Sequence, residues 1–223
     1  MRTVRHLLFG CMLFVLAGCA ANMPLTANQD TLDLSNESIA LVSVKVANQY
    51  KSSYQPGMMY AFFFPEGEDG EKTHIDIKTD PVVSEDDKYN EYILNFSLKP
   101  GTYNFAAIWG QYQVPLLLNA TCVIPLNLKV EIKPNCVSYL GHIDAVIRKR
   151  NNDGEQRAGA VVPLLDQAVV GFSGGTFDVA ISDQYGEDMG RFLAKYPALN
   201  NVTVEKNVLS QWVRPKLMSE AAE

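Results

Sequence analysis

The chain has 223 residues, a net charge of −6 at pH 7 and a hydrophobic content of 47%. This length is enough to bury a sizeable core in one large domain or two small ones. The acidic balance argues against nucleic acid or anionic lipid headgroups as the main partner. Beyond the N-terminal signal, no apolar run reaches the about 20 residues that a transmembrane helix requires.

The first nineteen residues have the three parts of a bacterial export signal. Arg2 and Arg5 give a basic start, residues 7–16 form a short apolar run, and small residues follow. The ending Leu16-Ala17-Gly18-Cys19 resembles the lipobox of bacterial lipoproteins. The resemblance implies that residues 1–18 are removed as a signal peptide and that Cys19 is acylated, which would anchor the protein to a membrane. An ordinary secretory signal or an uncleaved anchor, with Cys19 incidental, is the alternative.

The same resemblance implies a location in the cell envelope. In enterobacterial lipoproteins an aspartate after the cysteine marks retention at the inner membrane, whereas Ala20 and Ala21 follow Cys19 here. The outer membrane is therefore favoured, and within it the periplasmic face is favoured over the cell surface. Removal of the signal takes away two arginines and no acidic residue, so the charge of the mature chain becomes −8.

The segment that follows the lipobox is polar. Residues 19–38 contain Pro24 and several Asn and Asp, and they show no hydrophobic periodicity. We therefore predict a flexible, lipidated tether over residues 19–38, with a root-mean-square reach of roughly 20–25 Å.

From residue 39 onward, short apolar or alternating segments follow one another and are separated by turn-forming clusters. We predict strands within residues 39–46, 58–64, 73–78, 92–98, 102–109, 114–118, 126–132, 137–147 and 202–206. Asn152-Asp153-Gly154 predicts a hairpin turn, with the chain returning through residues 156–162. Many short strands at this spacing predict an antiparallel β-sandwich over residues 39–206, followed by a C-terminal tail over residues 207–223.

Near the C-terminal end of the predicted sandwich, the hydrophobic period changes to that of a helix. We predict an α-helix over about residues 183–196, capped by Ser182 or Asp183 and packed on the sandwich. Gly186 and Gly190 weaken a helix relative to alanine, so we expect them to permit close packing on one side. The predicted fold is thus mainly β, with one C-terminal α-helix.

Three segments resemble parts of known bacterial proteins. Leu98-Lys99-Pro100-Gly101-Thr102-Tyr103 is similar to the Pro-Gly-x-Tyr turn of prealbumin-like sandwich modules. Tyr139-Leu140-Gly141-His142-Ile143 and residues 183–197 resemble segments of poorly characterised bacterial lipoproteins of that type. The resemblance implies a prealbumin-like or Ig-like sandwich. Its motifs are turns and core positions, so it carries over no catalytic residue.

Cys122 and Cys136 are the cysteines that remain in the mature chain besides Cys19. The oxidising periplasm favours a disulfide between them. One extended strand over residues 126–132 would hold them about 20 Å apart, however, and a bridge requires Cα atoms within about 7 Å. The disulfide therefore depends on whether residues 119–125 fold back along that strand, which the sequence leaves open.

Gly171-Phe172-Ser173-Gly174-Gly175 matches the Gly-x-Ser-x-Gly pattern of serine hydrolases. In that family a helix and later a histidine follow the serine, whereas a predicted strand and no histidine follow Ser173. We interpret the motif as a glycine-rich turn. An envelope hydrolase stays the alternative function, with a site assembled from distant residues such as Ser173, His142 and an aspartate.

No cofactor and no metal site are predicted. His74 and His142 have no Cys, His or Glu neighbour at metal-ligand spacing. The acidic clusters at residues 66–71 and 85–87 lack the spaced ligands of a calcium loop, so we interpret them as solvated turns.

Aromatic residues offer the best candidate for a binding surface, because large rigid rings contribute contact area at a low cost in entropy. Trp109 and Tyr112, near a strand end, are the pair that we expect to face a partner, whereas core packing is expected for Phe62–Phe64. We therefore predict a membrane-anchored, non-catalytic module that binds an envelope protein or glycan, or has a structural role.

Overall fold

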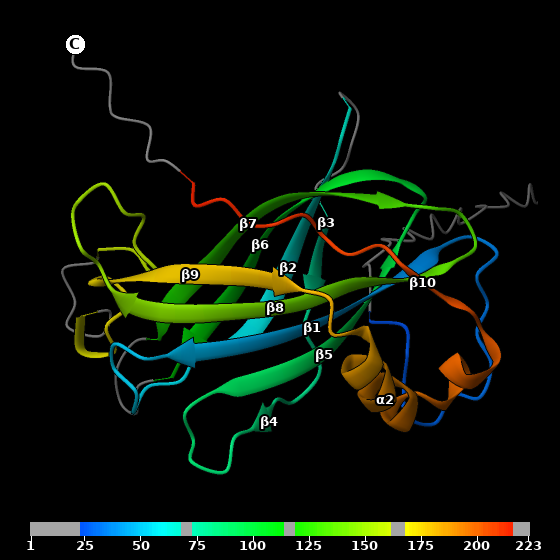
Figure 1. The fold of residues 1–223 in the computed structure, drawn as a ribbon, viewed down its shortest axis with the longest axis horizontal. Coiled ribbons are helices and arrows are strands. Elements are labelled where there is room, and N and C mark those ends of the chain that lie inside the picture. The colour runs from blue at the N-terminus through cyan, green and yellow to red at the C-terminus, as the bar shows by residue number, and fades with distance from the viewer. Residues whose placement is uncertain (1–22, 68–72, 114–118, 162–167, 216–223) are drawn as a thin grey trace, which may run out of the picture.

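The computed structural model describes residues 23–67, 73–113, 119–161 and 168–215. Two β-sheets lie against each other there, and a helix covers part of the outer face of the first sheet (Figure 1). The strands are β1 (Ser38–Asn48), β2 (Gly57–Pro65), β3 (Thr73–Asp76), β4 (Val82–Val83), β5 (Asn90–Leu98), β6 (Gly101–Tyr112), β7 (Ala120–Ile132), β8 (Val137–Lys149), β9 (Gly175–Ser182) and β10 (Val204–Lys206). The helices are α2 (Tyr185–Lys195) and the 3-10 helix η1 (Pro197–Asn201). The mainly β fold class with a packed helix is thereby confirmed.

The first sheet has the strand order β10-β8-β1-β5-β4, with β9 also pairing with β8, and the second sheet has the order β3-β2-β6-β7. The first sheet is mixed, because β8 runs parallel to β1 and β10 runs parallel to β8. The other strand pairs are antiparallel, as the prediction of a mainly antiparallel sandwich requires. The turn after β7 carries the chain from the second sheet to the first, and the Ile39 N–H donates to the Cys136 carbonyl at 3.0 Å. The starts of β1 and β8 therefore lie side by side.

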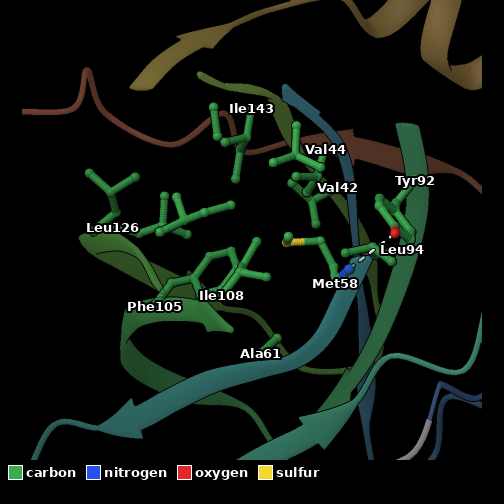
Figure 2. Packing of buried hydrophobic residues seen from close by; sticks show 14 of the residues in the cluster. Val42, Val44, Met58, Ala61, Tyr92, Leu94, Phe105, Ile108, Leu126 and Ile143 are labelled. Carbon is green, nitrogen blue, oxygen red and sulfur yellow. Dashed lines mark hydrogen bonds between the residues drawn. The ribbon is translucent and has the colours of Figure 1, made fainter. Parts of the chain in front are cut away.

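An apolar core fills the space between the two sheets. Val42 of the first sheet and Phe105 and Ile108 of the second point into it (Figure 2). A hydrogen bond also joins the sheets, since the Met58 N–H donates to the Tyr92 hydroxyl at 3.0 Å. The free energy gained by burying each large apolar side chain is about 1.5–3 kcal/mol. The alternation of apolar residues along the strands thus determines which face of each sheet is inward.

A second apolar cluster lies between α2 and the outer face of the first sheet. Met189 and Phe192 of α2 are buried in it together with Leu41, Ile93 and Tyr139 of three sheet strands. The helix therefore buries one stripe of apolar side chains, as its sequence pattern predicts.

The ends and the glycines of α2 differ from the prediction in detail. Its N-cap residue is Gln184 and has no side-chain cap bond, so the predicted cap at Ser182 or Asp183 is wrong. The Asp183 carboxylate still accepts a hydrogen bond from a backbone N–H of the first turn, at 3.1 Å. A Cβ atom at Gly186 or Gly190 would have no atom within 4 Å. These glycines therefore do not serve close packing.

The hairpin predicted after β8 is also different. Residues 156–161 form no strand, and β8 pairs instead with β9. The Glu155 carboxylate accepts hydrogen bonds from the Arg148 guanidinium at 2.5 and 2.9 Å and from the Asn151 N–H at 2.7 Å. The Glu155 carboxylate thus ties the turn back to the end of β8. The chain leaves β8 there and does not form a second strand of a hairpin. The strand predicted over residues 114–118 lies outside the described residues.

Both ends of the described chain pack on the domain. Within residues 23–37, Leu25 is only 4% exposed, and its N–H donates to the Asn95 side-chain oxygen at 2.8 Å. Within residues 207–215, the Trp212 indole donates to a β7 carbonyl at 2.6 Å. The described parts of the predicted tether and tail thus belong to the folded unit.

Candidate functional site

A buried polar group lies between α2 and the first sheet. Asp188 of α2 is 0% exposed, and the Tyr139 hydroxyl donates to its Oδ2 at 2.6 Å. The Nδ1 atom of His142 lies 3.3 Å from both carboxylate oxygens of Asp188, and His142 is 3% exposed. Tyr139 and His142 lie on β8 and Asp188 lies on α2, so the fold brings together two segments that are distant in the chain.

A β-bulge in β8 places the tyrosine and the histidine on the same face. Leu41 of β1 pairs with Tyr139 and Ser43 pairs with His142, so β8 has one residue more than β1 between these pairs. The extra residue reverses the alternation of side chains beyond it, as bulges do. Gly141 occupies the bulge with φ +111°, a conformation that other residues rarely adopt. Tyr139 and His142 therefore both face α2.

The carboxylate and the imidazole shift each other's pKa values. Burial alone lowers the pKa of His142, but its bond to Asp188 and the nearby carboxylates of Asp144 and Glu91 outweigh burial and raise it. Burial alone raises the pKa of Asp188, but its bonds to His142 and Tyr139 outweigh burial and lower it. The pair is therefore ionised over a wider range of pH than its separate members would be.

A second ion pair joins α2 to the sheet beside the first. Arg191 Nη1 lies 2.5 Å from Glu91 Oε1 on β5 and 3.8 Å from Asp188 Oδ1. The helix thus presents a carboxylate to a histidine and a guanidinium to a glutamate. Pairs of this kind select one placement of the helix on the sheet, because any shift would leave buried charges unpaired.

The other imidazole nitrogen of His142 lies near a second carboxylate, that of Asp144. His142 Nε2 lies 3.8 Å from Asp144 Oδ2. Asp144 lines a groove of about 290 Å³ together with Lys45 and Tyr89, whose ring centre lies 4.3 Å from the Lys45 Nζ atom. A histidine oriented by a buried aspartate is the geometry of a general base. Among the described residues, however, no serine, threonine or cysteine hydrogen-bonds to His142, so a paired nucleophile is missing there.

Ser173 lies at the opposite end of the hairpin that contains His142. Gly175 of β9 pairs with Lys149, and Ser182 pairs with His142. Seven residue steps along the strand separate these two pairs, a distance of about 23 Å. The structure therefore removes the hydrolase site that would combine Ser173 with His142. Ser173 itself lies in a turn, which confirms the interpretation of its glycine-rich motif.

Four aromatic side chains lie together on the outer face of the second sheet, and we call them the aromatic face: Tyr60 and Phe62 on β2, His74 on β3 and Trp109 on β6. The ring centres are 6.1 Å apart for Tyr60 and His74, 6.3 Å for Phe62 and His74, and 6.4 Å for Phe62 and Trp109. Trp109 is 41% exposed. The adjacent residues Ala61 and Phe63 point into the core, so β2 presents Tyr60 and Phe62 outward.

Of the two residues predicted to form a partner surface, only Trp109 belongs to the aromatic face. Tyr112 packs against the core, with its ring edge-on to Tyr54 at 5.3 Å. The core packing expected for Phe62–Phe64 is confirmed for Phe63, which is buried, and is wrong for Phe62, which lies on the outer face. The period-two alternation of Tyr60 and Phe62 is the sequence signal that could have found this surface.

Cys122 and Cys136 are both free. Cys122 is buried near the start of β7, and Cys136 lies beyond its end. Because β7 is extended from Ala120 to Ile132, residues 120–125 do not fold back, and the disulfide considered above is absent. Burial raises the pKa of the Cys122 thiol.

Cys19 lies outside the described residues. Within residues 23–67, 73–113, 119–161 and 168–215, no three His, Cys, Asp or Glu side chains are arranged to hold a metal ion. In the same ranges, no helix is long and apolar enough to cross a membrane. No protein-family model, curated protein or solved structure matches the chain significantly.

Proposed function

We propose that this chain is a lipid-anchored protein of the bacterial envelope that acts as a non-catalytic binding module. Its anchor would be an acylated Cys19, in the outer membrane and on the periplasmic side. Its folded part would be a prealbumin-like sandwich. The aromatic face supports the binding role, because aromatic residues are enriched at the centres of protein interfaces.

The geometry of the rings favours a protein as the partner. The ring planes of Tyr60 and His74 lie at 70° to each other, and so do those of Phe62 and Trp109. Such rings expose edges as well as faces, so they make an uneven apolar surface rather than a flat platform on which a sugar ring would stack. Trp and Tyr are also the residues that most often dominate the affinity of protein interfaces.

The test is an in-cell crosslinking pulldown from membranes, with the unaltered chain compared with Trp109→Ala. Loss of a central tryptophan at an interface costs about 2 kcal/mol or more, so we expect capture of the partner to fall at least about tenfold. Val213→Ala is the matched control, because Val213 is 81% exposed and lies outside the aromatic face. This control should capture as much partner as the unaltered chain.

Two further results bear on the proposal. A Cys19→Ser form exported by a non-lipoprotein signal should still capture the partner, since the surface and not the lipid would recognise it. Equal capture by Trp109→Ala and by the unaltered chain would contradict the aromatic face as the binding surface. Recovery of envelope glycan instead of a protein would show that the partner is a glycan and would contradict the preference for a protein.

A further inference from the structure

Residues 23–37 do not behave as the flexible tether that their composition predicts. Leu25 is buried in the cluster under α2, and Leu32 and Leu34 pack against the same cluster. At the start of the segment, the side chain of Met23 packs against the main core, and its sulfur accepts a hydrogen bond from the Lys78 N–H at 3.4 Å. The segment is therefore attached to the domain along its length.

This attachment shortens the connection to the lipid. Only Ala20, Ala21 and Asn22 stand between Cys19 and Met23 in the sequence. Four residue steps of fully extended chain span at most about 14 Å. If Cys19 is acylated, as the proposed function requires, the Met23 Cα must therefore lie within that distance of the Cα of the anchored residue.

The place where Met23 attaches determines which part of the domain is closest to the anchor. Met23 contacts Lys78, which lies between β3 and β4. β3 is the edge strand of the second sheet, and β4 is the edge strand of the first. The anchor therefore enters at the side of the molecule where these two edges lie.

The same edge exposes apolar residues. Val82 and Val83, which make up β4, are 62% and 51% exposed, respectively. The two valines pair with Glu91 and Asn90 of β5 through the strand register, and their side chains stay exposed. Aliphatic side chains this close to an acyl anchor can be buried at the lipid interface, which gives about 25 cal/mol per Å² of apolar surface removed from water.

We propose that residues 23–37 fix the orientation of the domain at the membrane, with the β3–β4 edge and its two valines against the lipid surface. This inference rests on the proposed acylation of Cys19. It also deepens the proposed function, because His74 of the aromatic face lies on β3 itself and Tyr60 lies on the neighbouring strand. The partner would then be a protein in or on the same membrane.

The test measures energy transfer from a fluorophore on the lipidated protein to an acceptor lipid in vesicles. Single labels are placed through Lys78→Cys at the proposed membrane edge and through Ala180→Cys on β9, in a Cys136→Ser background. β9 and β4 lie at opposite sides of the first sheet, four strand spacings or about 19 Å apart. We expect several-fold more transfer from position 78 than from position 180.

Two substitutions separate the role of the attached segment from that of the lipid. Leu25→Asp places a charge in the buried cluster and should release the segment, so transfer from position 78 should fall towards that from position 180. Thr26→Asp adds the same charge at an exposed neighbour and should leave the difference intact. Equal transfer from both positions of an acylated chain would overturn this inference alone. Absence of fatty acid on Cys19 would overturn the proposed function and this inference with it.

Discussion

The Tyr139 hydroxyl donates a hydrogen bond of 2.6 Å to the Asp188 carboxylate, although the two residues are 49 positions apart in the chain. This bond joins the central part of the first sheet to the helix that covers it. His142 shares the same carboxylate, so one fully buried aspartate holds two side chains of β8. The attachment of α2 therefore depends on a polar group as well as on its apolar stripe.

Asp188→Asn should destabilise the protein strongly. The substitution keeps the shape of the side chain but removes the charge that pairs with His142 in a buried position. Loss of one partner of a buried ion pair costs about 3–5 kcal/mol, and we expect a decrease in the free energy of unfolding at the lower end of that range. Chemical denaturation measures it. Glu187→Gln removes a charge from the exposed neighbouring position and should change the free energy by less than about 0.5 kcal/mol.

The stability of the protein should decrease as the pH rises above 6.5. The pKa of His142 is raised above its usual 6.5 in the folded state. Its contribution to stability is therefore complete below pH 6.5 and is lost as the pH rises through the folded pKa. The pKa of Asp188 is lowered below its usual 3.8, so its contribution is present above that pH and is lost on stronger acidification.

The free energy of unfolding measured from pH 3 to pH 9 tests this expectation. His142→Gln removes the titrating group and should flatten the decrease above pH 6.5. His74→Gln changes the exposed histidine and should retain it. A profile above pH 6.5 that is the same in all three chains would contradict a role for the His142–Asp188 pair.

Gly141→Ala and Gly190→Ala should have opposite effects. At position 141, φ is +111°, and a Cβ would lie 3.1 Å from a Val208 methyl group and 3.2 Å from the Ser182 carbonyl oxygen. Backbone strain of this kind costs about 1–3 kcal/mol, and the contacts add to it. At position 190 a Cβ would meet no atom within 4 Å, so alanine should stabilise the helix by about 0.5–1 kcal/mol. Thermal unfolding of both variants gives the comparison.

The two cysteines of the domain should titrate as free thiols of different reactivity. In the native state, a thiol reagent should modify Cys136 readily and Cys122 slowly, because Cys122 is buried and burial raises its pKa. In the unfolded, non-reduced protein, both should react. Failure of both to react after unfolding would indicate a disulfide and would contradict the extended course of β7.

Local patterns were sufficient to predict most of the strands and α2. Leu126, Leu128 and Val130 occupy every second position in the predicted part of β7, and burial on one face is the direct consequence of that period. The helix lies within the predicted residues 183–196 because its apolar residues recur with a helical period. Both inferences need only neighbours in the chain.

Pairings between distant segments could not be obtained in this way. β8 pairs in parallel with β1 because the turn after β7 takes the chain from the second sheet to the first. No local pattern in the sequence indicates that change of sheet. Tyr139 and His142 share a face because of the bulge at Gly141. In a regular strand, residues three positions apart would point to opposite faces of the sheet. An acidic residue in the first turn of a helix suits the helix dipole whether it is exposed or not, so the sequence alone does not show that Asp188 is buried. Its burial follows from the packing of α2 on the sheet.

The N-terminal part of the chain shows the same division. A lipid on Cys19 can be predicted without any structure, because the lipobox is a contiguous motif in the sequence. The sequence also indicated a flexible tether, since residues 23–37 have no periodic apolar pattern. The tertiary structure alone decided that these residues are attached, because isolated apolar side chains such as Leu25 bind only to an apolar surface that α2 and three strands create together.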